Sequence, residues 1–163
     1  MGNTFKVTDY DIIYLSYDEP NAEKNYADLC KKVPWAKRVH GVEGSDAAHK
    51  ACAELSETDR FITVDGDNIV DEKFINQEID FDEHEDLQQS VISWAGYNVV
   101  NGLMYGNGGL SCWTKNFVYN IDCITVLGDH VLNLVYSIYN ILNLFRLLFA
   151  KRCESVNFFF SSG

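Results

Sequence analysis

The sequence is poor in basic residues: its 163 residues include 13 Lys and Arg against 24 Asp and Glu, a formal net charge of −11. An excess of negative charge repels a phosphate backbone, so we expect no broad electrostatic grip on nucleic acid. Internal repeats and low-complexity linkers are also missing. The length is sufficient for one domain with an adequate hydrophobic core.

Cysteine is present without a metal-binding or redox pattern, since no two cysteines form a Cys-x-x-Cys pair. An odd number of cysteines without a signal peptide favours reduced thiols and a cytoplasmic location. The five cysteines are Cys30, Cys52, Cys112, Cys123 and Cys153.

The negative charge is confined to the first part of the chain. Residues 1–116 contain 21 acidic and 10 basic residues, whereas residues 117–163 contain three of each. The second part is apolar and we expect it to be helical, with an uncertain role. Val131–Ala150 is long enough to span a membrane, but several polar residues interrupt it, so we expect no transmembrane span. The interrupting residues are Asn133, Asn140, Asn143 and Arg146.

An amphipathic helix in this second part would pack on the sheet or on a partner, and a homo-oligomer formed through it is one possible arrangement. The other interpretation is that residues 117–163 do not belong to the ancestral domain, for example after a frameshift or a truncation.

The first part predicts alternating strands and helices. Tyr10–Ser16 is expected to be a strand, followed by a helix from about Ala22 that Asp18 caps and Pro34 ends. Lys37–Val42 is expected to be the second strand, and Gly44-Ser45 a turn and cap before a second helix. Crossovers between parallel strands are right-handed in nearly all cases. The loop after the first strand, the start of the second helix and the end of the third strand should therefore share one edge of the sheet.

The third strand, Phe61–Val64, is apolar and runs directly into Asp65-Gly66-Asp67. Gly66 would let the backbone turn so that both carboxylates face one hard cation. Such a pair would hold Mg²⁺ or Mn²⁺ weakly and leave positions open for the oxygens of a diphosphate. Asp-Gly and Asp-Asn are also common turn sequences, so an ordinary loop is the alternative.

These segments together resemble the nucleotide-sugar-binding half of GT-A glycosyltransferases, whose signature is an Asp-x-Asp motif at the end of a strand. The matching residues are Asp65-Gly66-Asp67 and the first strand ending in Ser16-Tyr17-Asp18-Glu19-Pro20. Ser93–Asn98 and Tyr105–Lys115 look like phage-encoded members of that superfamily, which would place the protein in a host cytoplasm. The resemblance covers about residues 9–116.

The resemblance implies an α/β fold, a Rossmann-like three-layer sandwich with a mostly parallel sheet. GT-A catalytic domains are generally longer than this chain, so the acceptor half is expected to be incomplete. Residues 1–116 would form the nucleotide-sugar-binding domain, with a uridine diphosphate sugar as the favoured donor and an unknown acceptor.

The family's site residues carry over to matching positions. Asp67 would be the most direct metal ligand, and Asp65 would contact the ribose or reach the metal through water. Ser16 and Asp18 would lie beside the base and ribose. The glycine pair Gly108 and Gly109 would let the backbone approach the donor sugar.

The second helix adds two candidates. His49 and Lys50 lie in its first turns, where a helix N-terminus favours anions, and are placed to meet phosphate. Ordinary surface or packed positions remain the alternative for both side chains.

The chemistry implied is glycosyl transfer, in which a divalent cation stabilises charge that builds on the β-phosphate. An inverting enzyme also needs a carboxylate base. Asp129 is the nearest candidate and Asp122 the next, although a lone Asp before a helix is first an N-cap. His130 would be a third metal ligand or an ordinary helix-start histidine.

Two other functions stay open. A phosphohydrolase of the haloacid dehalogenase type also places Asp-x-Asp after a strand, but that family has Thr or Val soon after the second Asp, where this chain has Asn68-Ile69. A non-catalytic nucleotide-sugar-binding or remnant protein would keep the fold without the acceptor half.

Overall fold

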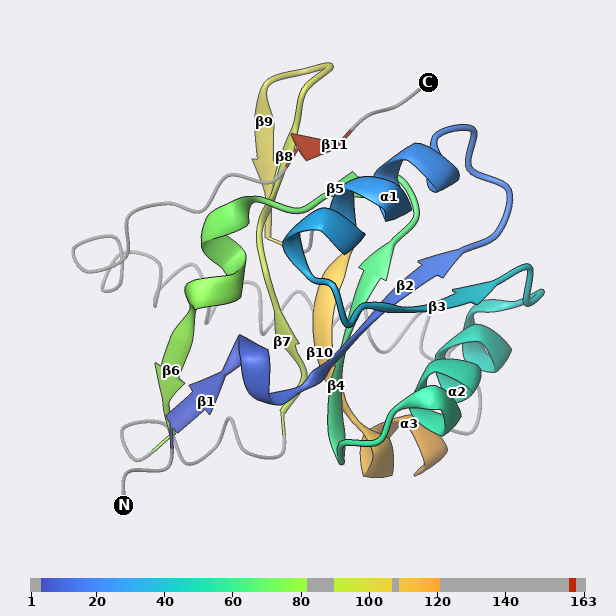
Figure 1. Cartoon of the computed structure of the whole chain (residues 1–163), viewed down its shortest axis with the longest axis vertical. Helices are drawn as coiled ribbons and strands as arrows, with labels where there is room; N and C mark the ends of the chain where they lie inside the picture. Colours follow the sequence, from blue (N-terminus) through green and yellow to red (C-terminus); the bar gives the residue numbers. More distant parts are fainter. Residues whose placement is uncertain (1–3, 82–89, 107–108, 121–158, 161–163) are drawn as a thin grey trace.

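The computed structural model is a mixed α/β fold around a five-stranded sheet in the order β3-β2-β4-β10-β7 (Figure 1). Strands β2 (Asp11–Ser16), β3 (Lys37–His40) and β4 (Arg60–Asp65) are parallel neighbours. Strand β10 (Leu110–Thr114) runs antiparallel to β4 and to β7 (Ile92–Ser93). The sheet is therefore mixed rather than mostly parallel, and the three-layer sandwich stays a prediction. The structure describes residues 4–81, 90–106, 109–120 and 159–160.

The expected βαβαβ order is confirmed for the first three strands and two helices. Helix α1 (Ala22–Lys32) connects β2 to β3, and helix α2 (Ser45–Leu55) connects β3 to β4. The predicted cap at Asp18 was wrong, whereas the turn and cap predicted at Gly44-Ser45 is confirmed in position. Asn21 and Gly44 occupy the N-cap positions, and neither helix start has a side-chain cap hydrogen bond. The loop with Asp18 is long enough that the helix begins only after Pro20.

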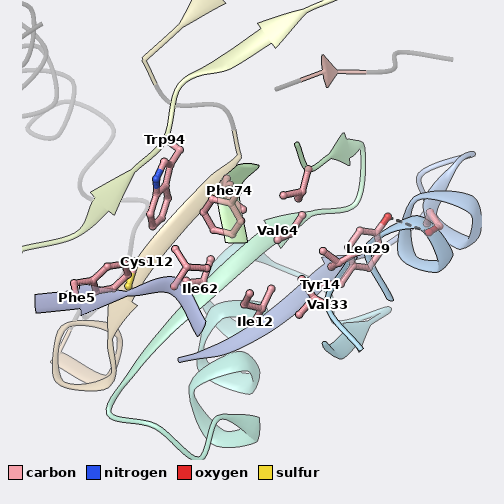
Figure 2. Packing of buried hydrophobic residues seen from close by; sticks show 14 of the residues in the cluster. Phe5, Ile12, Tyr14, Leu29, Val33, Ile62, Val64, Phe74, Trp94 and Cys112 are labelled. Atoms are coloured by element: carbon pink, nitrogen blue, oxygen red, sulfur yellow. Dashed lines mark hydrogen bonds between the residues drawn. The ribbon is translucent and has the colours of Figure 1, made fainter. Parts of the chain in front are cut away.

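Alternate residues of the strands face two apolar clusters, as the period of a strand requires. The larger cluster lies on the α1 side and includes Ile12, Ile62 and Val64 from the strands (Figure 2). The smaller cluster lies on the other side, where Ile13 and Phe61 pack with residues of α2 and of α3 (Lys115–Asn120). Both faces of the sheet centre are thus buried, which fixes where the strand ends emerge.

Two smaller sheets flank the main one. Strands β1 (Thr4–Lys6) and β6 (Glu78–Asp80) form an antiparallel pair. The second small sheet has the order β5-β11-β8-β9. Its strands are Asn68–Ile69, Phe159–Phe160, Gly96–Asn98 and Leu103–Tyr105, in that order. The 3₁₀ helices η1 and η2 span Val7–Asp9 and Glu72–Asn76.

Helix α3 crosses the predicted boundary between residues 116 and 117, and its Val118 is buried in the smaller cluster. The two phenylalanines of β11 also fall in the second part of the chain. Val131–Ala150 lies outside the described residues. In the part of the chain that the structure describes, no helix is long and apolar enough to cross a membrane. The three cysteines described, Cys30, Cys52 and Cys112, are free.

Candidate functional site

The acidic turn Asp65-Gly66-Asp67 follows β4 at the carboxyl edge of the three parallel strands. In open α/β sheets this is the edge where ligands bind. The Asp65 N–H donates to the Gly109 carbonyl oxygen at 2.9 Å, so the turn is tied to the start of β10. Asp65 is half-buried and Asp67 is exposed.

The peptide carbonyl of Gly66 is held from the interior of the protein. The Tyr14 hydroxyl of β2 donates to this oxygen, and the Asn25 side-chain amide of α1 donates to it at 3.1 Å. Tyr14 and Asn25 are both buried. Neither residue was selected by sequence reasoning.

Gly66 is required for space rather than for the turn freedom expected from the sequence, because its φ is not positive. A Cβ at this position would lie 2.6 Å from Glu19 Oε2 and 3.0 Å from the Ser16 Cβ. A Cβ would therefore push the flexible end of the Glu19 side chain away from the turn and crowd Ser16. Glu19 and Ser16 therefore pack directly against the acidic turn.

Gly109 closes the turn from the β10 side and has a φ of +70°. A Cβ here would lie 2.6 Å from Asp65 Oδ2, so the Gly109 backbone lies directly beside this carboxylate. A larger residue would be strained by the positive φ and would also collide with Asp65. The structure thus places Gly109 at the acidic turn. Its predicted companion Gly108 lies outside the described residues.

Three negative side chains converge at this edge. Burial raises the pKa of Asp65 from its ordinary 3.8 to about 6, and the charges of Asp67 and Glu19 add to the rise. Asp67 has an exposed side chain, yet the protein around its carboxyl group removes part of its hydration. Its pKa is raised first by this desolvation and then by Glu19, although its own backbone N–H opposes the shift. Like charges crowded in this way favour protonation or a bound cation.

Glu19 is a site residue that the sequence reasoning missed, because that reasoning chose its neighbour Asp18. The Tyr17 N–H donates to Glu19 Oε2 at 2.8 Å, which bends the side chain back toward the acidic turn. Asp18 is exposed in the same loop. The available signal was the position of two acidic residues just after a parallel strand, and either one could have reached the turn.

Ser16 is buried at the end of β2 and belongs to a polar cluster on the α1 side. Its hydroxyl accepts a hydrogen bond from Arg38 Nε at 3.1 Å and lies 2.9 Å from His40 Nδ1. Arg38 in turn forms an ion pair with Glu23 at 2.8 Å. The Ser16 hydroxyl is therefore engaged with β3, while its Cβ borders the acidic turn.

His49 and Lys50 lie in the first half of α2, as expected. His49 Nδ1 lies 2.8 Å from the Ser45 carbonyl oxygen, and its ring meets Trp113 edge-on at a centroid distance of 4.9 Å. These contacts place His49 over the α2 side of the sheet. Lys50 is half-buried. A phosphate role for either residue stays a prediction.

The donor chemistry of the acidic turn fits a hard divalent cation, because carboxylate oxygens are the ligands that Mg²⁺ and Mn²⁺ prefer. A cation would also offset the burial of the Asp65 charge and its repulsion by Asp67 and Glu19, which together raise the Asp65 pKa. Among the described residues, no group of three or more His, Cys, Asp or Glu is arranged to hold a metal ion. Asp122, Asp129 and His130 lie outside the described residues.

No protein-family model and no curated protein matches the sequence. Two solved structures are similar at a low level. A glycosyltransferase involved in the glycosylation of the major capsid of PBCV-1 is 16% identical, with a TM-score of 0.33 over 67% of this chain and 62% of the other. HddC from Yersinia pseudotuberculosis is 15% identical, with a TM-score of 0.30 over 69% of this chain and 59% of the other. The match thus spans less than two thirds of either solved chain, and function has to be inferred from the site residues.

Proposed function

We propose that the carboxyl edge of β2, β3 and β4 binds a nucleoside-diphosphate sugar together with Mn²⁺ or Mg²⁺. The protein would then be a metal-dependent glycosyltransferase, or the donor-binding domain of one. The observation that carries this proposal is the crowding of partly buried carboxylates at one strand end, where burial first and then the charges of Asp67 and Glu19 raise the pKa of Asp65 to about 6. Such crowding costs folding free energy, and a bound cation would offset this cost.

Asp67 is the exposed carboxylate of the pair and is the ligand we assign to the cation, with Asp65 contributing through the ribose or through water. A bound divalent cation supplies Lewis-acid stabilisation of charge on the diphosphate leaving group. Gly109 lets its backbone lie directly beside the Asp65 carboxylate, because a Cβ there would collide with Asp65. We favour a uridine nucleotide as donor, with the sugar and acceptor undefined.

The test is a thermal-unfolding series with uridine, guanosine and adenosine diphosphates, each with Mn²⁺, Mg²⁺ or a chelator. A ligand at 100 times its Kd adds about 2.7 kcal/mol to the unfolding free energy, which is several degrees for a domain of this size. We expect uridine diphosphate with Mn²⁺ to give the largest shift, and the chelator to abolish most of it.

Equal small shifts for every nucleotide, unchanged by the chelator, would contradict a metal-dependent donor site. Hydrolysis of a uridine diphosphate sugar in the presence of Mn²⁺ would further support a transferase. Phosphatase activity without nucleotide preference would instead support a phosphohydrolase.

A further inference from the structure

The Gly66 carbonyl has two interior donors that come from different elements. The Tyr14 hydroxyl approaches from β2 and the Asn25 amide from α1, and they are separated from Gly66 by 52 and 41 positions in the sequence. The Tyr14 hydroxyl also lies 3.0 Å from the Ala22 carbonyl oxygen, but its contact with Gly66 is the shorter one. Long-range side-chain bonds of this kind to one loop carbonyl hold the loop in a single orientation.

The held carbonyl belongs to the peptide that joins Gly66 to Asp67. A peptide group is planar, so fixing its oxygen also fixes the direction in which the chain reaches the Asp67 Cα. Glycine is the residue with the widest choice of backbone conformations. A Cβ at position 66 would displace the Glu19 carboxylate from the turn, so glycine preserves this packing while leaving the backbone permissive. The two donors supply the restraint that glycine lacks.

We propose that Tyr14 and Asn25 are positioning residues that preorganise Asp65 and Asp67 for a divalent cation by clamping the carbonyl between them. This inference rests on the proposed function, because it assigns the clamp to the same metal-nucleotide site. Neither residue touches the cation or the nucleotide in this arrangement. Their effect is on how often the free protein holds the two carboxylates in the binding orientation.

The environment keeps Tyr14 in its donor form. Burial, and then the charge of Glu19, raises the pKa of the Tyr14 hydroxyl above its ordinary value of 10. The Tyr14 hydroxyl therefore keeps its proton at neutral pH, at which it can donate a hydrogen bond to the Gly66 carbonyl. Arg38 lies over the Tyr14 ring, with its guanidinium carbon 5.7 Å from the ring centroid, which fixes the ring on the α1 side.

Tyr26 offers a matched control. Its ring lies beside that of Tyr14 at a centroid distance of 5.3 Å, and Arg38 also lies over it. The Tyr26 hydroxyl donates to a main-chain carbonyl as well, that of Ala36, at 3.2 Å. Ala36 lies between α1 and β3, away from the acidic turn. Tyr14→Phe and Tyr26→Phe thus each remove one hydroxyl from the same interface, and only the first reaches the site.

The experiment compares Tyr14→Phe, Asn25→Leu and Tyr26→Phe with the wild type as full-length chains. Uridine diphosphate is titrated by calorimetry in saturating Mn²⁺ and again in a chelator, and unfolding is followed by circular dichroism. We expect about tenfold weaker Mn²⁺-dependent binding for Tyr14→Phe, equivalent to 1.4 kcal/mol. Asn25→Leu should weaken it about threefold, since its bond is the longer of the two. Tyr26→Phe should stay within twofold of the wild type.

A merely structural role predicts a different pattern, in which Tyr14→Phe and Tyr26→Phe lower the melting temperature and the nucleotide affinity together, with or without metal. Wild-type Mn²⁺-dependent affinity in Tyr14→Phe, or an equal loss in Tyr26→Phe, overturns the clamp. If Tyr14→Phe does not fold, Asn25→Leu decides, and unchanged affinity in that variant overturns the proposal. A wild-type protein without Mn²⁺-dependent binding would instead overturn the proposed function, and the clamp with it.

Discussion

The two edges of the parallel strands contain the same residue type in opposite electrostatic settings. At the amino edge, Asp11 forms an ion pair with Lys37 at 3.1 Å and accepts a hydrogen bond from the Glu57 N–H. Burial alone would raise the pKa of Asp11, but these partners outweigh it and the pKa is lowered. At the carboxyl edge, burial and neighbouring carboxylates raise the pKa of Asp65.

This difference separates an edge that stabilises the fold from the edge at which we propose that a ligand binds. The amino edge stabilises the fold, because its carboxylate gains partners when the chain folds. The carboxyl edge does the reverse, since folding buries Asp65 and brings its negative charge close to those of Asp67 and Glu19. Polar sites that cost stability are often the functional ones. Substitutions at the two edges should therefore change different measured quantities.

The largest effect on folding is expected for Asp11→Asn. Losing charged hydrogen bonds should lower the unfolding free energy at pH 7 by about 2 kcal/mol, measured by urea denaturation. Folding lowers the Asp11 pKa below its ordinary 3.8. The contribution of the Asp11 carboxylate to the unfolding free energy is therefore complete above about pH 3.8 and is lost as the pH falls through the pKa of the folded state. The variant should consequently lose less stability on acidification than the wild type. Weakened nucleotide binding in this variant would break the separation of the two edges.

The next effect is on binding and concerns Asp67→Asn. The amide keeps the shape but removes a charge that offsets a divalent cation, so Mn²⁺-dependent affinity for uridine diphosphate should fall at least tenfold, about 1.4 kcal/mol. Stability of the free protein should hold or rise, since Asp67 contributes to the repulsion on Asp65. Calorimetry and urea denaturation on the same variant measure both quantities. A stability loss with unaltered binding would mean that the pair is only a turn.

The smallest expected effect is a stability gain in Asp65→Asn. Folded Asp65 binds its proton more tightly than the unfolded chain, with a pKa of about 6 against 3.8. The contribution of protonated Asp65 to the unfolding free energy is therefore complete below about pH 3.8 and is lost as the pH rises through about 6. At pH 7 the variant should be more stable by about 1 kcal/mol, less than the full shift implies because a buried amide is itself costly. The gain should vanish near pH 4, and a loss of stability at pH 7 would show that Asp65 is held by favourable partners.

The parallel half of the fold was predictable from local patterns. Each of its signals depends on residues that lie close together in the sequence. These signals are the apolar run Phe61–Val64, the helix end at Pro34 and the helical spacing of the segment between the two. The mixed sheet was not predictable in this way. The antiparallel place of strand β10 between β4 and β7 depends on partners far away in the sequence. The segment Tyr105–Lys115 was selected by its resemblance to a family, and that resemblance did not predict the direction of the strand.

The site was predicted in part for the same reason. Asp65 and Asp67 follow a strand directly, so topology alone places them at the sheet edge. Gly109 reached the same turn through the resemblance, and the structure places it beside Asp65. Tyr14 and Asn25 looked like ordinary core and helix residues, because their shared acceptor lies more than 40 positions away. The residues next to Tyr14 and Asn25 in the sequence therefore do not indicate that these side chains bind the Gly66 carbonyl.

The position of β10 also sets the order in which this edge can assemble. The Ser111 carbonyl oxygen accepts from the Thr63 hydroxyl across the β4–β10 pair, 48 positions apart, and β10 follows β2, β3 and β4 in the chain. During synthesis, β2, β3 and β4 emerge from the ribosome before β10 and can therefore pair first. Until β10 arrives, β4 has an open edge beside the acidic turn, and charge repulsion at that turn discourages a second nascent chain from pairing there.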